Sequence, residues 1–376
     1  MEKRNTAKGE LGKRWYAVFD WVLFITALII AVCGIIFVYS ATFSSSTEYF
    51  QRIYIKQIEW NIYGMILMIF LCVLDYRNLE RPAYLVYGIF VLLLLSVLLS
   101  GRVISGSQRW ISIAGMNMQP SELIKVVLVI TLARYFDDQR DKNEMGFRAL
   151  AIPGIIMAIP AFLIFKQPDL GTALIMAIIF SVMAFVSGIR RNTLAIIIVS
   201  VLIAIPAMWF NLKPYQKNRV MAMLDPASDP LGIGYHTIQS KIAIGSGGLW
   251  GKGIFAGTQS KLNFLPEKHT DFIFSVFAEE VGFFGAMLLL TLYLLMFLRM
   301  IDIILKAKDR GGVLLAVGGT TIIAFHFFYN VSMTLGIVPI VGIPMPLFSY
   351  GGSSIITNYA ILGILQSVHM RRYRHD

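Results

Sequence analysis

Five charged side chains stand in or beside apolar stretches of the chain, and their types and spacing could support chemistry. Asp271 precedes an apolar run that also contains Glu279 and Glu280. Glu122 and Lys125 stand three residues apart in another apolar run. Placing an ionisable group inside a membrane-spanning helix costs at least ~2.5 kcal/mol, so each such group needs a partner or a function. A carboxylate can take a proton from an attacking hydroxyl, and a fixed cation can offset developing negative charge.

Each of these groups also has a purely structural explanation. Glu122 and Lys125 have the spacing of an ion pair within one helix. Asp271 stands at the expected start of a helix, where a carboxylate stabilises the helix dipole by about 0.3–1 kcal/mol, and its position alone favours that role. The helix positions that follow Asp271 on the same face are small or polar and are expected to line a cavity: Ser275, Ala278 and Gly282.

Two polar segments add candidate substrate-binding residues. The loop GSQRWI contains Arg109 and Trp110, a guanidinium that can bind a pyrophosphate and an indole that can stack on a sugar. Trp110 is otherwise explained as an anchor at the membrane interface, the usual role of such a residue. Lys268 and His269 stand just before Asp271 and join Glu280 among the candidates.

The sequence lacks the patterns of a metal site or a common hydrolase. Its five histidines have no ligand spacing with carboxylates or with the two cysteines. P-loop, GxSxG and HExxH motifs are absent. Any chemistry must therefore rest on carboxylates, cations and a cavity that lipids can reach.

The composition determines what kind of fold positions these residues. Of 376 residues, 57% are hydrophobic and only 15% are charged, and the mean hydropathy is +0.68. This excludes a soluble domain, in which about a quarter of the residues are charged. The net charge of +11 indicates loops that face anionic membrane lipid rather than nucleic acid. We expect an all-α polytopic membrane protein with a single integral membrane domain over residues 1–376.

A membrane-spanning helix needs about 20 mostly apolar residues, and the charge-poor stretches of the chain predict ten such helices. Lys and Arg are concentrated in one set of alternate loops, which places both termini in the cytoplasm and makes residues 1–18 a cytoplasmic tail. The first span is too long for the apolar region of a cleaved signal peptide and is expected to be retained. The expected spans are 19–39, 60–74, 83–99, 121–136, 150–165, 170–188, 194–211, 272–298, 313–335 and 353–369.

Two connections on the expected outer face are unusual. Residues 212–270 form one long extracytoplasmic loop between the seventh and eighth helices, with a glycine-dense passage at 245–257. Length and glycine content alone favour a flexible loop. Residues 336–354 connect the last two helices and are apolar, with three prolines. Such a connection is expected to be re-entrant, at membrane depth but surrounded by protein.

Several blocks of sequence, in this order, resemble the SEDS family of shape, elongation, division and sporulation proteins. They are GSQRWI with MQPSELIK, then QSKIAIGSGG, FLPEKHTDFIFSVFAEE and GIPMPLFSYGGSS. The similarity runs from about Phe19 to the C-terminal arginines. The second and third blocks resemble the elongation branch, and the division and sporulation branches are the alternatives within the family.

The resemblance implies a peptidoglycan glycosyltransferase of the bacterial cytoplasmic (inner) membrane. It would polymerise lipid II on the outer face, with a class B penicillin-binding protein and the elongation machinery as partners. The essential aspartate of the family corresponds to Asp271. The RW pair and QPSE block of the family correspond to Arg109, Trp110, Gln119, Pro120, Ser121 and Glu122, followed by Lys125.

Residues and resemblance lead to one expected mechanism. Asp271 would take the proton of the acceptor sugar's 4-hydroxyl, while Arg109 and Lys125 offset the charge on the leaving pyrophosphate. Direct displacement would invert the sugar carbon. A divalent cation, Mg²⁺ or Mn²⁺, could assist, although the sequence shows no dedicated site for one.

Two other functions fit parts of the sequence. A lipid II transporter (flippase) would use intramembrane charges as a pathway, but its inverted repeats predict two matched halves. No counterpart of 212–270 occurs in the N-terminal half. A scaffold that only recruits the penicillin-binding protein leaves Glu122, Lys125 and Glu280 unexplained.

Overall fold

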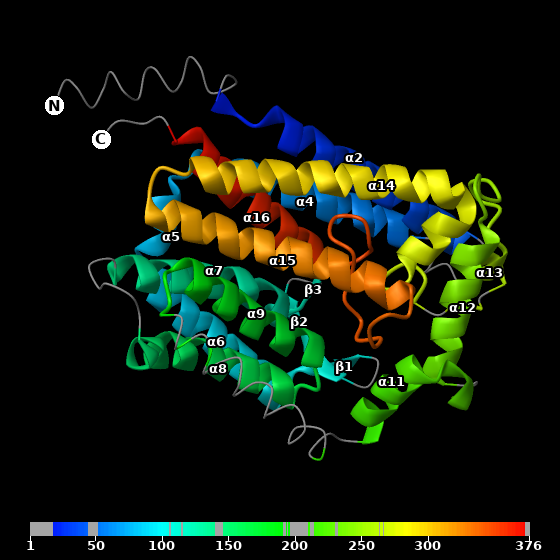
Figure 1. Ribbon diagram of the computed structural model, residues 1–376, viewed down its shortest axis with the longest axis horizontal. Helices are drawn as coiled ribbons and strands as arrows, with labels where there is room; N and C mark the ends of the chain where they lie inside the picture. Colours follow the sequence, from blue (N-terminus) through cyan, green and yellow to red (C-terminus); the bar gives the residue numbers. More distant parts are fainter. Residues whose placement is uncertain are drawn as a thin grey trace.

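The computed structural model describes residues 18–43, 52–104, 107–113, 116–139, 146–190, 193, 195, 210, 214–229, 232–262, 264–265 and 267–372. Within these residues, long helices lie side by side in a bundle (Figure 1). The long helices are α2 (Trp21–Phe43), α4 (Ile53–Val73), α6 (Ala83–Ser100), α7 (Pro120–Asp138), α8 (Ala151–Lys166), α9 (Leu170–Val186), α14 (Ile273–Lys306), α15 (Arg310–Thr334) and α16 (Gly352–Met370). The shorter helices are α5 (Tyr76–Glu80), η1 (Phe147–Leu150), α11 (Pro214–Leu224), η2 (Pro226–Ser228), α12 (Ile233–Ser246) and α13 (Thr258–Lys261).

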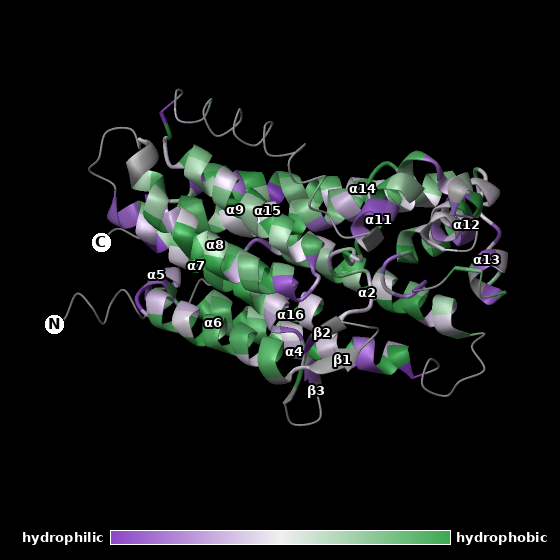
Figure 2. Cartoon of the chain, turned by 90° about the horizontal axis from the view of Figure 1, so that it is seen from below, coloured by the Kyte–Doolittle hydropathy of each residue, from purple (hydrophilic) through white to green (hydrophobic). Residues whose placement is uncertain are grey.

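The long helices agree with most of the expected spans. Nine of the ten coincide with a described helix, while the seventh, 194–211, lies almost entirely outside the described residues. Four helices, α2, α4, α14 and α15, are long and apolar enough to cross a membrane, and α6, α8 and α9 are shorter apolar helices. Figure 2 shows hydrophobic residues along the bundle and hydrophilic ones gathered toward its ends. The chain is a multi-pass membrane protein, and the count of ten spans stays a prediction.

Helix α4 begins seven residues earlier than expected, at Ile53 rather than Trp60. Its first turns contain Lys56 and Glu59, whose charges are exposed and break the apolar pattern. Gln57, between them, is buried and donates a hydrogen bond from Nε2 to the Ser349 carbonyl (3.1 Å). The polar start of the helix therefore packs against the connection before α16. A search for apolar stretches cannot detect such a contact.

Three short strands correct the expectation of a purely helical chain. They are β1 (Arg102–Ile104), β2 (Ser107–Ile113) and β3 (Met116–Met118), paired antiparallel in the order β1-β2-β3. Arg102 lies opposite Trp110, and Ile111 lies opposite Met118. Only two residues separate each pair of strands in the sequence, and the second is glycine each time. That spacing is typical of tight hairpins, so the sequence did contain the signal.

Helices α7, α15 and α16 form the centre of the bundle. Helix α16 is buried along almost its whole length and packs along α4, α7 and α15. A helix surrounded by protein on all sides needs no polar face, which explains the absence of charged residues in α16.

The start of α2 and the end of α16 lie at the same end of the bundle. The backbone N–H of Asp20 donates to Gln366 Oε1 (3.0 Å), and Gln366 Nε2 donates back to the Asp20 carbonyl (2.8 Å). The strands and the helices α11 to α13 lie toward the opposite end (Figure 1). The two ends of the described chain thus share one side, while the orientation in the membrane stays a prediction.

The long segment before α14 is not a flexible loop in the part that the structure describes, which corrects the expectation from its glycines. It contains α11, η2, α12 and α13. Helix α14 has non-helical backbone at Gly282 (φ 72°, ψ −167°), and the glycine-dense segment 245–257 packs there. Gly248 and Leu249 accept hydrogen bonds through their carbonyls from the N–H groups of Phe283 (2.9 Å) and Phe284 (3.2 Å). A Cβ at Gly247, Gly251 or Gly282 would lie less than 3.0 Å from backbone atoms across this contact, so side chains there would block the approach.

Candidate active site

Asp271 lies in the turn that leads into α14. The backbone N–H groups of Thr270 and Asp271 both donate to the Glu267 carbonyl (3.1 Å each). Asn330 of α15 donates from Nδ2 to the Asp271 carbonyl (2.9 Å), which fixes the turn against the bundle. Gly342 faces the carboxylate, because a Cβ at that glycine would lie 3.2 Å from Asp271 Oδ2. The backbone of Asp271 is therefore held while its side chain has a glycine for a neighbour.

The Asp271 carboxylate is partly buried and accepts no hydrogen bond from the residues that the structure describes. Burial and, to a smaller extent, the charge of Glu267 raise the pKa of this carboxyl to about 7, against an opposing effect of Arg219. A carboxylate with a pKa near neutrality can both take and release a proton at physiological pH. This is the property expected of a general base.

Lys268 and His269 lie on the inner side of the same turn. Both side chains are buried, and burial is the main cause that lowers the pKa of each. The His269 carbonyl accepts a hydrogen bond from the N–H of Tyr350 (2.9 Å), and the two rings lie 5.7 Å apart. Through these contacts, the turn carrying Asp271 is attached to the connection between α15 and α16.

That connection, residues 336–351, is irregular, and its second half is largely buried between Ile343 and Ser349, whereas residues 336–342 are half-buried or exposed. Side chains from the helices satisfy its carbonyls: Tyr329 Oη donates to Pro339 (3.0 Å), and Tyr293 Oη to Pro346 (2.5 Å). Non-helical backbone at membrane depth is stable only where protein supplies such partners. The bundle therefore holds this segment against Asp271.

Glu122 and Lys125 form the expected ion pair, with Lys125 Nζ 2.8 Å from Glu122 Oε1. The Lys125 side chain is 0% exposed. A third group, His326 of α15, places Nε2 2.9 Å from the same ammonium. The pair is thus a buried cluster of three residues from α7 and α15.

A small cavity of about 10 Å³ connects this cluster with the neighbourhood of Asp271. Glu122 Oε2 and His326 Nδ1 have no hydrogen-bond partner among the described residues. Gly342 lines the cavity and also faces the Asp271 carboxylate. The lining comprises Glu122, Gly171, Thr172, Ile175, His326, Gly342, Ile343 and Pro344.

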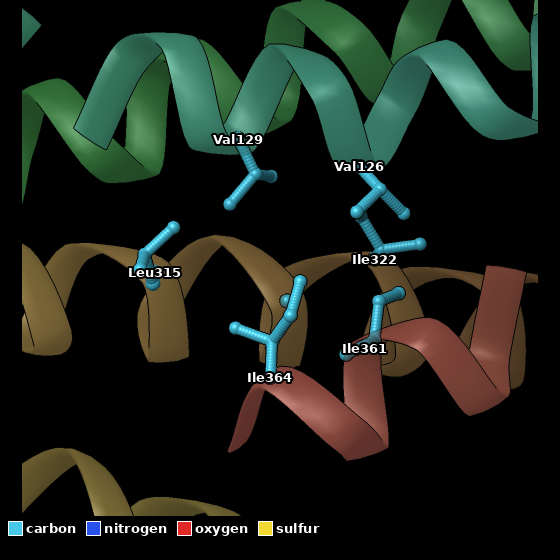
Figure 3. A pocket seen from close by; sticks show the side chains of 7 residues that line it. Val126, Val129, Leu315, Ile322, Ile361 and Ile364 are labelled. Atoms are coloured by element: carbon cyan, nitrogen blue, oxygen red, sulfur yellow. The ribbon is translucent and has the colours of Figure 1, made fainter. Parts of the chain in front are cut away.

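A second cavity of similar size, between α7, α15 and α16, is lined only by glycine and aliphatic side chains (Figure 3). Val126, Leu315 and Ile361 point into it from the three helices. An apolar void of this kind offers no partner to a sugar or a phosphate. It is a packing feature of the core and not part of the candidate site.

Arg109 joins the sheet to the start of α9. Its guanidinium donates to the carbonyls of Gln167 (2.8 Å) and Pro168 and lies 3.4 Å from Asp169 Oδ2. Asp169 caps α9 by accepting a hydrogen bond from the Thr172 N–H (3.2 Å). Arg109 therefore has local partners, and its side chain remains 22% exposed. Trp110, next to it on β2, is also partly exposed.

The block that follows the sheet connects it with α16. The backbone N–H of Gln119 donates to Ser353 Oγ (2.9 Å), and Pro120 begins α7. Ser121 is buried in the first turn of that helix, beside Glu122. This block fixes the start of α7 and hence the position of the ion pair.

Glu280 does not join Asp271 in one site. It accepts hydrogen bonds from Ser40 Oγ (2.6 and 2.8 Å) and from the Phe255 N–H (3.2 Å). The expected cavity along this face of α14 is also wrong, since Ser275 contacts Ser240 of α12 (2.7 Å). Ala278 and Gly282 pack against the backbone of the glycine-dense segment. A role for Glu280 in substrate binding stays a prediction.

Sequence reasoning missed His326, Asn330 and Asp169. The first two were detectable as a histidine and an asparagine four residues apart in a stretch without charged residues. Asp169 has the position of a helix N-cap after proline. Among the residues that the structure describes, no group of three or more His, Cys, Asp and Glu side chains could hold a metal ion.

Known proteins resemble this chain over most of its length. The model of the cell cycle protein family of FtsW, RodA and SpoVE matches residues 20–374. The peptidoglycan glycosyltransferase MrdB of Escherichia coli (strain K12) is 42% identical over 82% of this chain and 83% of its own. The peptidoglycan glycosyltransferase RodA of Treponema pallidum is 33% identical over 94% of this chain and 98% of its own.

Solved structures show the same fold. A chain from a study of structural coordination of polymerization and crosslinking by a peptidoglycan synthase complex matches with a TM-score of 0.80 at 32% identity, over 95% of this chain and 99% of that chain. The crystal structure of the Thermus thermophilus rod shape determining protein RodA matches with a TM-score of 0.70 at 29% identity, over 95% and 98%. This chain therefore belongs to the SEDS family, the family of FtsW, RodA and SpoVE proteins.

Proposed function

We propose that this protein is a peptidoglycan glycosyltransferase that polymerises lipid II into glycan strands during cell elongation. Relatives that match most of this chain, MrdB and RodA among them, are named peptidoglycan glycosyltransferases. MrdB is 42% identical to this chain. The observation that carries the proposal is Asp271, whose carboxylate is partly buried, faces a glycine and has a pKa raised to about 7.

In the proposed reaction, the 4-hydroxyl oxygen of the acceptor sugar attacks the anomeric carbon of the donor. Its proton passes to Asp271, and the bond from that carbon to undecaprenyl pyrophosphate breaks, with the electron pair leaving on the pyrophosphate oxygen. The sugar carbon is inverted. No general acid is needed, because a pyrophosphate leaves as a stable anion.

The two cations contribute differently to this reaction. Arg109 is partly exposed and can turn part of its guanidinium toward a pyrophosphate. Lys125 is buried and paired with Glu122, so it acts through the field of an oriented ion pair. Trp110, Lys268 and His269 remain proposed substrate contacts, and a divalent cation would share the charge of the diphosphate.

The partner and location follow from the same family. We propose a class B penicillin-binding protein as the partner and the bacterial inner membrane, with the sheet and α12 on its outer face, as the location. The match to a chain of a peptidoglycan synthase complex supports this arrangement.

A gel-based polymerisation assay on purified protein tests the function. Wild-type protein is incubated with lipid II, with and without a class B partner, beside Asp271→Asn and the exposed control Asp225→Asn. We expect polymer from the wild type and the control and none from Asp271→Asn. Polymer from a well-folded Asp271→Asn variant would reject Asp271 as the base. Movement of lipid II between leaflets without polymer, in the wild type, would instead favour the transporter.

A further inference from the structure

Helix α15 carries two buried polar side chains one turn apart, and the mechanism above uses neither. His326 is 3% exposed and Asn330 is 0% exposed. They are four residues apart, so they lie on one face of the helix, about 6 Å apart along its axis. One turn earlier on this face, Ile322 points into the apolar cavity of Figure 3. The face thus changes from apolar to polar as it approaches Asp271.

His326 fixes the position of the Lys125 ammonium. An ammonium has three donors and no acceptor, so the short contact requires His326 Nε2 to accept, which places the imidazole proton on Nδ1. Lys125 is thereby held from two sides, by Glu122 Oε1 and by His326 Nε2 (2.8 and 2.9 Å). A flexible side chain with two fixed acceptors keeps one orientation.

Asn330 fixes the backbone of Asp271. Its Nδ2 donates to two carbonyls, that of Asp271 (2.9 Å) and that of Ile343 (2.8 Å). The first carbonyl belongs to the turn before α14, and the second belongs to the 336–351 connection, next to Gly342. Asn330 therefore fixes the distance from α15 to the backbone of Asp271 and to the segment that contains Gly342.

Stability alone does not explain these two residues. His326 Nδ1 and Asn330 Oδ1 have no hydrogen-bond partner among the described residues, although both side chains are buried. Leaving a buried polar atom unpaired costs about 1–3 kcal/mol, and each of these side chains carries that cost beside the contacts that it makes. An unpaired buried polar atom next to two candidate reactive groups indicates a role in function.

We propose that His326 and Asn330 are positioning residues that hold the Lys125 cation and the Asp271 base at a fixed separation through one turn of α15. This inference rests on the proposed function. Because both reach their targets from the same rigid helix, a lost contact at either residue changes the geometry of the reacting groups without removing one of them. A misplacement of about 1 Å can lower turnover about 100-fold.

Leucine and glutamine variants test this proposal. His326→Leu and Asn330→Leu remove the contacts at similar volume, while His326→Gln keeps an acceptor for Lys125. Thr321→Val is the matched control, because its hydroxyl binds only the Val317 carbonyl of its own helix (2.8 Å). Turnover and KM for lipid II are measured on monodisperse protein, with melting temperature and co-purification of the class B partner as measures of folding.

We expect both leucine variants to lose at least about tenfold in kcat with KM nearly unchanged, and His326→Gln to recover most of that loss. Full turnover in the leucine variants, beside an inactive Asp271→Asn, would overturn the positioning role and leave the function intact. An active Asp271→Asn variant would instead overturn the function.

A measurement on the wild type tests the contact itself. Nitrogen-15 NMR of histidine-labelled protein, with His326→Gln subtracted to assign the signal, reports which ring nitrogen carries the proton. We expect a neutral His326 imidazole protonated on Nδ1. An imidazolium, or a ring protonated on Nε2, would contradict acceptance from Lys125 and overturn the proposal.

Discussion

The turn before α14 and the first turns of α14 contain acidic residues in opposite situations. Glu279 is fully buried, and its Oε1 accepts from Lys252 Nζ (2.7 Å), from the Thr258 N–H (2.8 Å) and Oγ1 (2.9 Å), and from the Gln259 N–H (3.1 Å). The carboxylate of Asp271 accepts no hydrogen bond from the described residues, while its backbone is tightly held. A carboxylate surrounded by donors serves structure, whereas one with a fixed backbone and free oxygens can react.

The largest effect is expected from Asp271→Asn. An amide cannot take the proton of the acceptor hydroxyl, so we expect turnover to fall by about 10²–10⁴-fold, the usual contribution of a general base. The melting temperature should hardly change, because no hydrogen bond to the carboxylate is lost. Initial rates and thermal unfolding of the same preparation test both statements.

Glu279→Ala should show the reverse pattern. It leaves the Lys252 ammonium, whose side chain is 27% exposed, and three partly buried donors without their acceptor, which costs about 1–3 kcal/mol of stability. We expect a lower melting temperature and protease cleavage in the glycine-dense segment, while the folded fraction retains turnover per molecule. Wild-type stability in this variant would mean that the cluster does not hold the segment.

Gly342→Ala tests the space beside the base. The backbone at this residue has φ of +81°, which costs a non-glycine residue about 1–2 kcal/mol, and the new Cβ would lie 3.2 Å from Asp271 Oδ2. We expect about a tenfold loss of turnover at modest cost in stability. Gly88→Ala is the control, since nothing lies within 4 Å of a Cβ there.

The pH profile gives the most specific effect. Since the pKa of Asp271 is raised to about 7, its base form is lost as the pH falls through that value. Turnover should therefore decline on the acidic side, about tenfold per pH unit below 7. A profile that stays flat down to pH 5 would show that this carboxyl is not the base, and the Glu279→Ala variant should keep the wild-type profile.

The sequence was sufficient for most of the fold. Apolar runs predicted nine spans that coincide with described helices, because hydropathy is a local property of the chain. The start of α4 was predicted too late, because the charged residues Lys56 and Glu59 interrupt the apolar pattern of its first turns. Gln57 in these turns is buried through a hydrogen bond to a residue nearly 300 positions away, which no local pattern indicates. The sheet was missed, although the paired glycine turns were present in the sequence.

For the site, the sequence by itself determined which groups are candidates for the chemistry. Asp271, Arg109 and the Glu122–Lys125 pair were identifiable from charge within apolar surroundings and from family resemblance. Only the tertiary structure decided which residues lie beside them: His326 joins the ion pair, Gly342 faces the Asp271 carboxylate, and the glycine-dense segment packs on α14. The reason is physical, because residue spacing specifies which side chains share a helix face, whereas packing between helices far apart in the sequence decides which faces meet.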